Sequence, residues 1–358
     1  MAGSTRRALP WIAGVVALVI ALGFLPPIQA RAKGLALVLE ALGAHVPHPF
    51  APRVARHTVT WDGVRGDLYG PGAAAPGIVL VHGAAVLGKD DPRLVRLARS
   101  LARAGRLVFV PQLELAQRRF VPEDLDRIVR AVVALGERDG STTLPSLLGI
   151  SYGGSFALVA AADPRIRGGL TQVAVFGAYF DLAGVIQAVT TGVSIVGDRR
   201  IPWNGPPEAR AILEEGAADL APAASRAGLA EALARRDPSD LSADGRALYE
   251  LLVNRDPERT RELVARLSPR ARRVFERFSP SSVAGGIEAP VIAMHSLDDP
   301  AVPFAEAIRL SRGLPEARLV VVRGFRHVDF RARRDLGTAL GDLRGAWRFA
   351  SWLLAAQE

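Results

Sequence analysis

The chain of 358 residues contains no cysteine. This absence excludes a disulfide scaffold, a thiolate nucleophile, and zinc or iron–sulfur sites with cysteine ligands. Only six residues are histidine, so a reaction that needs an imidazole has few candidates. No histidines show the H-x-x-x-H or H-E-x-x-H spacing of a helical zinc site. We therefore expect neither a metal ion nor another cofactor.

Lysine is almost absent as well, being confined to Lys33 and Lys89. The net charge of +9 is therefore almost all arginine, and the arginines are scattered between acidic residues. No block of about five or six like charges occurs, and no groove-reading motif accompanies the charge. We expect no nucleic-acid partner. Hydrophobic residues make up 49% of the chain, enough to bury a large core.

The first thirty-odd residues differ from the rest, because Arg6-Arg7 precede an uncharged, apolar segment. The run from Ala8 to Leu25 approaches the roughly 20 residues that span a bilayer and exceeds the usual apolar centre of a signal peptide. The pattern predicts an anchor within residues 1–33, with the rest of the protein outside the cytoplasm. Cleavage near Ala30, followed by secretion, is the alternative.

The globular part opens with a β-hairpin, because His57–Trp61 and Val64–Tyr69 flank Asp62-Gly63, a signal for a primed turn. Short apolar runs without polar alternation then alternate with helical patterns, as in strands that are buried on both faces of a parallel sheet. The expected strands are Gly77–Val81, Leu107–Val110, Leu147–Ile150, Val173–Phe176, Val291–Met294 and Leu319–Val322. The expected helices are Pro92–Ala104, Pro122–Leu135, Ser155–Ala162, Phe304–Leu314 and Leu336–Leu354. The sequence predicts an α/β protein with a doubly wound, mostly parallel sheet.

One interval, Asp181–Glu288, breaks this rhythm, because it has no convincing strand but several helical patterns. These cover Pro207–Glu215, Arg226–Arg235, Ala243–Leu252, Pro257–Leu267 and Ala271–Phe278. We interpret residues 181–288 as a helical cap inserted between the sixth and seventh strands. Residues 34–180 and 289–358 then form the core.

The segment Gly149-Ile-Ser-Tyr-Gly-Gly154 fits the pattern G-x-S-x-G directly after an expected strand and before an expected helix. In that context the small residues allow a sharp turn that exposes Ser151 as a nucleophile. After an earlier strand, His82-Gly83-Ala84 provides a glycine turn toward the same edge. We expect the backbone N–H groups of Ala84 and Tyr152 to form an oxyanion hole, and we assign His82 to loop structure.

From Val59 to Trp352 the chain resembles the α/β-hydrolase-fold serine hydrolases, esterases and lipases among them. In that family the serine is followed by an acid and then by a histidine. Here a late strand leads into His295-Ser-Leu-Asp-Asp-Pro-Ala-Val-Pro303, and the last strand leads into Gly324-Phe-Arg-His327. Ser296 stands where many members carry glycine.

The resemblance implies a triad of Ser151, an aspartate and His327. Elimination also favours His327, because the other five histidines lie before the sheet or at strand ends with other assignments. Asp298, Asp299 and Asp181 compete for the acid. We choose Asp299, because it fits D-x-x-V-P with Val302 and Pro303, and proline suits the first turn of the following helix.

These residues predict a serine hydrolase that acts on a small-molecule ester or acyl substrate, most plausibly a carboxylic ester. Ser151 attacks the carbonyl, His327 carries the proton and Asp299 orients His327. The same groups also support thioesterase, lipase or peptidase chemistry. A non-catalytic, membrane-tethered binding protein is the alternative from another class.

Overall fold

The computed structural model describes residues 26–44, 46, 54–70, 72, 75–139, 143–220, 226–327, 329–330 and 336–355. The expected anchor from Ala8 to Leu25 lies outside these residues. Within the described ranges, no helix combines the length and the apolar character that crossing a bilayer requires.

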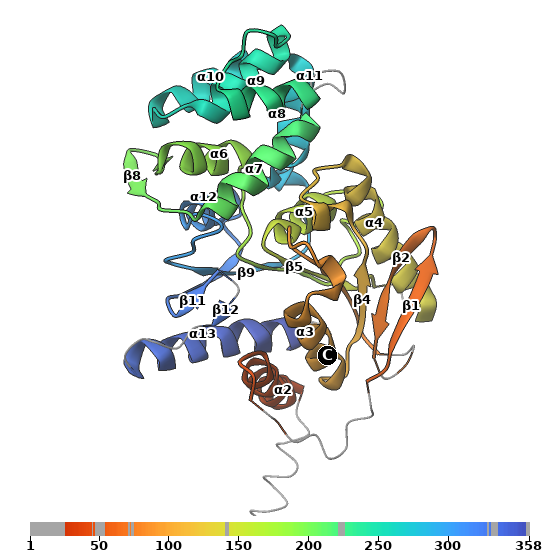
Figure 1. Ribbon diagram of the computed structural model, residues 1–358. Helices are drawn as coiled ribbons and strands as arrows, with labels where there is room; N and C mark the ends of the chain where they lie inside the picture. Colours follow the sequence, from red (N-terminus) through yellow and green to blue (C-terminus); the bar gives the residue numbers. More distant parts are fainter. Residues whose placement is uncertain are drawn as a thin grey trace, which may run out of the picture.

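An eight-stranded sheet forms the centre of the protein, with the strand order β1-β2-β4-β3-β5-β6-β9-β10 (Figure 1). Its strands are β1 (Arg56–Trp61), β2 (Val64–Tyr69), β3 (Gly77–Val81), β4 (Leu107–Pro111), β5 (Ser146–Ile150), β6 (Val173–Phe176), β9 (Val291–Ser296) and β10 (Arg318–Val322). The pairs β1–β2 and β2–β4 are antiparallel, and all other neighbours are parallel. Asp62 and Gly63 both have positive φ, 45° and 69°, as the primed turn requires. The predicted sheet and hairpin are confirmed.

Helices cover both faces of the sheet, and the sheet separates two hydrophobic cores. The covering helices are α2 (Pro26–Ala41), α3 (Pro92–Arg103) and α13 (Leu336–Ala355) on one face, and α4 (Pro122–Gly136), α5 (Tyr152–Ala161) and α12 (Ala305–Gly313) on the other. Strand β3 shows the division, because Ile78 and Leu80 pack into the first core and Val79 and Val81 into the second. This explains why its sequence is apolar throughout.

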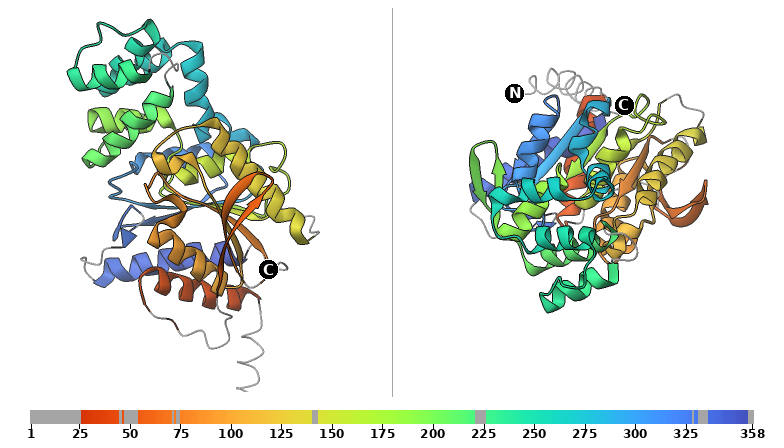
Figure 2. Two further views of the ribbon diagram at one scale, coloured as in Figure 1. Left: turned by 45° about the vertical axis from the view of Figure 1, so that its right-hand side comes forward. Right: turned by 90° about the horizontal axis from the view of Figure 1, so that it is seen from above.

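The apolar stretch from Leu35 to Leu42 predicts a helix, and in the structure this helix, α2, already begins at Pro26. It lies against α13 and α3 (Figures 1 and 2), with Ala30, Leu37 and Val38 buried. The indole Nε1 of Trp347 donates to the carbonyl of Arg31 at 2.7 Å. The expected boundary at residue 33 therefore falls inside a core helix, and cleavage near Ala30 would remove its first turn.

Between β6 and β9 the chain forms a mainly helical insertion, which lies on the side of the molecule opposite to α2 and α13 (Figure 1). Its helices are α6 (Leu182–Thr191), α7 (Pro207–Leu220), α8 (Arg226–Arg235), α9 (Ala243–Val253), α10 (Thr260–Arg266) and α11 (Pro269–Arg277). The expectation of no strand was wrong, because β7 (Val193–Val196) and β8 (Arg199–Pro202) form an antiparallel hairpin. Its two-residue turn begins at Gly197, with φ 61°, so the turn signal was present but the strands are only four residues long.

The insertion contacts loops at the carboxyl ends of the parallel strands. The indole Nε1 of Trp203, just after β8, donates to the carbonyl of Asp299 after β9 at 2.8 Å. Arg118, after β4, forms an ion pair with Glu215 of α7 at 3.0 Å. The insertion is thus attached to both sides of the edge at which Ser151 lies.

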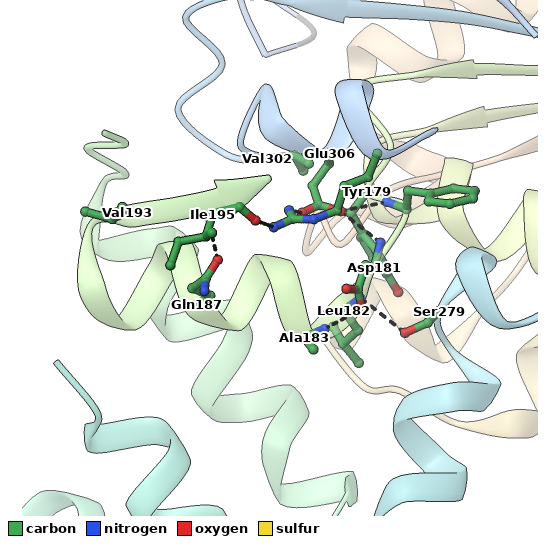
Figure 3. A network of polar contacts seen from close by, with 12 residues as sticks. Tyr179, Asp181, Leu182, Ala183, Gln187, Val193, Ile195, Ser279, Val302 and Glu306 are labelled. Atoms are coloured by element: carbon green, nitrogen blue, oxygen red, sulfur yellow. Dashed lines mark hydrogen bonds and ion pairs between the residues drawn. The ribbon is translucent and has the colours of Figure 1, made fainter. Parts of the chain in front are cut away.

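A buried carboxylate joins the insertion to the core (Figure 3). Glu306, in the first turn of α12, accepts hydrogen bonds from the backbone N–H groups of Phe180 at 3.0 Å and Asp181 at 2.8 Å. Its other oxygen pairs with Arg309, which donates to the carbonyl of Ile195 in β7 at 2.7 Å. One side chain therefore links the exit from β6, helix α12 and the hairpin of the insertion.

We expect α2 to be part of the cooperative core. A chain that starts at Gly34 should unfold at a temperature at least about 2–4 °C below that of a chain that starts at Pro26, because it lacks the buried Ala30 and the carbonyl acceptor of Trp347. Thermal unfolding followed by circular dichroism measures the difference. Equal unfolding temperatures would show that the first half of α2 adds nothing to stability.

We expect Glu306 to make stability depend on pH. Burial raises the pKa of Glu306 from 4.5 to about 7, against the opposing charge of Arg309 and the backbone donors. The folded state then holds this proton more tightly than the unfolded state, so the stability that it contributes is greatest below pH 4.5 and is lost as the pH rises to about 7. The unfolding free energy of the wild type relative to Glu306→Gln should fall by about 1–3 kcal/mol across this window.

Urea titrations at several pH values measure this difference. The exposed Glu316 provides a matched control, since Glu316→Gln should leave the pH profile of the wild type unchanged. A wild-type advantage over Glu306→Gln that grows with rising pH would contradict the assignment.

Candidate active site

Ser151 occupies a strained turn between β5 and α5. Its φ of 56° and ψ of −133° lie in a region that residues with side chains rarely adopt. Its N–H donates to the carbonyl of Phe176 in the neighbouring strand at 2.7 Å. Tyr152 directly after it begins the helix. This is the strand–turn–helix geometry that the sequence predicted for the motif.

The glycines of the motif are required by close backbone contacts. A Cβ on Gly149 would lie 2.4 Å from the Cα of Gly154, and a Cβ on Gly153 would lie 2.0 Å from the carbonyl oxygen of His82. A Cβ on Gly83 would lie 2.9 Å from the Cβ of Ser151. The loop after β3 therefore packs directly against the serine turn.

The buried Asp299 and the partly buried His327 form a pair at the same edge. The Nδ1 of His327 lies 2.8 Å from Oδ2 of Asp299, whose side chain is inaccessible to solvent. The other oxygen of Asp299 accepts from the N–H groups of Ala301 at 2.8 Å and Val302 at 2.9 Å. These bonds fix the carboxylate on the turn that leaves β9.

The surroundings keep Asp299 ionised. Burial opposes its ionisation, but the charge and the hydrogen bond of His327, together with the N–H of Val302, lower the pKa of Asp299 below its ordinary value. An ionised carboxylate can only accept, so Nδ1 of His327 carries the proton. The Nε2 of His327 is then the ring atom that can accept a proton.

Gly177 brings the serine and the histidine to one place, and sequence reasoning did not identify it. It follows Phe176, the carbonyl acceptor of the Ser151 N–H, and has φ 65°. A Cβ on Gly177 would lie 2.9 Å from Cε1 of His327 and 3.4 Å from Oδ2 of Asp299. Ser151 and His327 thus flank the same two-residue stretch. In the sequence, Gly177 could have been identified as a glycine that directly follows a buried strand.

The two backbone groups expected in the oxyanion hole lie in segments that adjoin Ser151. Tyr152 is the first residue of α5, so its N–H has no acceptor within the helix. Ala84 follows Gly83, which packs against the Cβ of Ser151. The structure therefore places both segments next to the serine.

The competing acids lie in other surroundings. Asp298 is exposed, whereas its neighbour Asp299 is buried. Asp181 is the N-cap of α6 and accepts from the N–H of Ala183 at 3.1 Å. Among the contacts that the structure describes, Asp299 is the candidate acid that lies against His327.

Two other histidines sit close to this site but are buried. Nδ1 of His82 lies 2.9 Å from the carbonyl of Gly83, and Nε2 of His295 lies 3.1 Å from the carbonyl of Val302. Burial lowers the pKa of both rings. His82 lies in the loop after β3, in line with its assignment to loop structure, whereas His295 belongs to β9 and its Nε2 also lies 3.7 Å from Oδ2 of Asp299.

An aromatic cluster packs around the first turn of α5 and supports the serine turn, and no sequence pattern indicated it. Its members are Phe120, Tyr152, Phe156, Tyr179 and Phe278. The hydroxyl of Tyr179 donates to the carbonyl of Phe278 at 2.9 Å. The first turn of α5 therefore rests on rigid rings that also touch the end of the insertion.

In the part of the chain that the structure describes, no group of three His, Asp or Glu side chains could hold a metal ion. The arrangement instead combines a hydroxyl, an imidazole and a carboxylate, which are the groups of acyl-transfer chemistry.

No protein-family model matches the chain, and no curated protein matches it either. Solved structures do match. EstE7, an HSL homologue from a metagenome library, gives a TM-score of 0.50 at 17% identity over 93% of this chain and 96% of that chain. Est1E from Butyrivibrio proteoclasticus gives 0.48 at 16% identity over 84% and 99%, and 2,6-dihydroxy-pseudo-oxynicotine hydrolase gives 0.48 at 17% over 86% and 68%. At such identities the likeness concerns the fold alone. The chain has the α/β-hydrolase fold, as its sequence predicted.

Proposed function

We propose that the protein is a serine hydrolase that cleaves carboxylic esters through an acyl-enzyme. The observation that carries this proposal is the 2.8 Å contact between the buried Asp299 and Nδ1 of His327, at the same sheet edge as the strained Ser151 turn. Buried carboxylates are costly, so one that is held against an imidazole points to a role in proton transfer.

In the proposed reaction, Oγ of Ser151 attacks the ester carbonyl while Nε2 of His327 takes the hydroxyl proton. His327 then gives that proton to the leaving alcohol, and the acyl group stays on Ser151. His327 then takes a proton from a water molecule, which attacks the acyl-enzyme, and returns that proton to Oγ of Ser151 as the bond to the acyl group breaks and the acid leaves. Asp299 holds the imidazole in its tautomer and stabilises the imidazolium that forms in both steps.

The proposed oxyanion hole consists of the N–H groups of Ala84 and Tyr152. They would stabilise the negative oxygen of each tetrahedral intermediate, and one such donor contributes about 10²–10³-fold in turnover in related chemistry. The N-terminus of α5 adds a favourable dipole at the same point.

We propose that the insertion acts as a cap over the sheet edge and thereby helps to determine which class of substrate the protein accepts. Its contacts with the loops after β4 and β9 support this role. Thioester, lipid or peptide substrates would use the same triad.

We propose that the segment from Ala8 to Leu25 anchors the protein in a membrane with the catalytic part outside the cytoplasm, or that cleavage near Ala30 releases it.

Labelling of the full-length chain with a fluorophosphonate probe tests the nucleophile. We expect stoichiometric labelling that is lost in Ser151→Ala, and hydrolysis of activated esters of graded acyl length. The same chain tested on matched thioesters and amides ranks the other chemistries. A folded wild-type chain that takes no label would favour a non-catalytic binding protein.

We expect Asp299→Asn to lower turnover by roughly 10⁴-fold with the fold intact, because the amide no longer holds the reactive tautomer of His327. Asp298→Asn is the matched control, since it makes the same change on the neighbouring, exposed residue and should cost less than about tenfold. Steady-state kinetics on one activated ester give both values. A collapse in Asp298→Asn with near-normal turnover in Asp299→Asn would show that the wrong aspartate has been chosen.

A further inference from the structure

A cavity lies on the face of the sheet that is turned away from the insertion. Helices α2, α3 and α13 enclose it against the sheet, and it has a volume of about 350 Å³. Small-molecule sites have volumes of about 300–1,000 Å³. None of Ser151, Asp299 and His327 lines it.

The cavity reaches the carboxyl ends of three central strands. Its inner wall includes Ile150 of β5, Phe176 of β6 and Met294 of β9. Strand β5 is paired on both sides, by β3 and β6, yet Ile150 is only half-buried. The exposed surface of Ile150 therefore faces the hollow, which extends from the outside of the helix layer to the residue before Ser151.

The wall is apolar except for two arginines of α3. Arg93 is engaged by Asp91, with an ion pair of 2.6 Å. Arg96 is exposed, its Nη1 lies close to Gly43 after the end of α2, and no hydrogen bond or ion pair joins it to another described residue. None of the described residues that line the cavity is acidic. The cavity thus has an apolar interior, and at its side lies the guanidinium of Arg96, which pairs with no other described residue.

The apolar interior and the guanidinium together indicate which class of ligand the cavity can bind. An apolar interior takes an alkyl chain, and a guanidinium takes a carboxylate through a charge-assisted pair of hydrogen bonds. At about 30 Å³ per water-sized group, the volume holds roughly a dozen methylene groups, which is one long chain rather than two.

We propose that this cavity binds a free long-chain fatty carboxylate, with its chain against Ile150, Phe176 and Met294 and its carboxylate on Arg96. The site is separate from the Ser151 edge and does not depend on the proposed hydrolase activity. A bound chain would fill the space beneath the nucleophile turn.

A palmitate analogue that carries a diazirine in its chain tests the location. The full-length protein is held in lipid nanodiscs, so that no detergent competes, and is irradiated with the probe and mapped by mass spectrometry. We expect labelled peptides from α2, α3 and α13. Labelling confined to the insertion or to the loops around Ser151 would overturn the proposal.

Competition on the wild type tests the ligand class. Unlabelled octanoate, dodecanoate and palmitate should compete with affinities that rise by up to about fourfold per methylene until the cavity is full. Hexadecanol should compete about tenfold less well than palmitate, because it lacks the charge. Equal competition by hexadecanol, or stronger competition by a two-chain phosphatidate, would contradict a single-chain carboxylate.

Paired variants separate the cavity from the nanodisc surface. Ala41 is exposed and lines the cavity, so Ala41→Trp should block it and lower labelling at least about tenfold. Ala32→Trp is the control, on the same helix and exposed but away from the cavity. Arg96→Gln should abolish the preference for palmitate over hexadecanol, whereas Arg99→Gln, on the same helix, should not. Equal labelling of both Trp variants, with thermal unfolding showing that both are folded, would refute the site.

Discussion

The close approach of three backbone segments around Ser151 is the constraint on which the rest of the structure depends. A serine at φ 56° is strained, and the surrounding fold must hold it in place. The loop after β3 and the first turn of α5 come within a distance that only glycine permits, at Gly83 and Gly153. At the end of β6 the carbonyl of Phe176 accepts from the N–H of Ser151, and Gly177, with φ 65°, leaves room for the ring of His327. Glycine is therefore required at these positions for the serine turn to form.

The histidine and the acid depend on the same contact region. Because Gly177 has no side chain, the ring of His327 can lie over the end of β6, where the N–H of Ser151 is bonded to Phe176. Asp299 reaches the ring from the turn after β9, and its own carbonyl is held by Trp203 of the insertion. Contacts from both the core and the insertion therefore hold Asp299 in position.

Much of this fold could be predicted from the sequence, because its elements are specified locally. The Asp62-Gly63 turn, the continuous apolar strands and the glycines around Ser151 each have one favourable local structure. The choice of Asp299 followed from the proline-led helix start, and the structure shows the contact with His327 that this choice requires.

The features that the sequence did not show are those decided by distant partners. Glu306 looks like an ordinary first-turn acid of a helix, and only the folded chain brings the N–H groups of Phe180 and Asp181 to it. Strand β7 has four residues, too few for a period to be recognised, and its pairing with β8 is supported by Arg309 from α12. Only the start of helix α2 was missed, because it adjoins the apolar run before Pro26.

The sheet separates two cores, and the nucleophile turn is where both meet. Ile150, before Ser151, packs toward the core of α2, α3 and α13, whereas Tyr152, after it, packs into the aromatic cluster beside the insertion. A change of packing on either face of the sheet therefore acts on a residue directly next to Ser151. Since close-packed interiors transmit displacement rather than absorb it, the position of Oγ depends on how well both layers are filled. On the face without the insertion, the hollow beneath Ile150 lies directly next to this point.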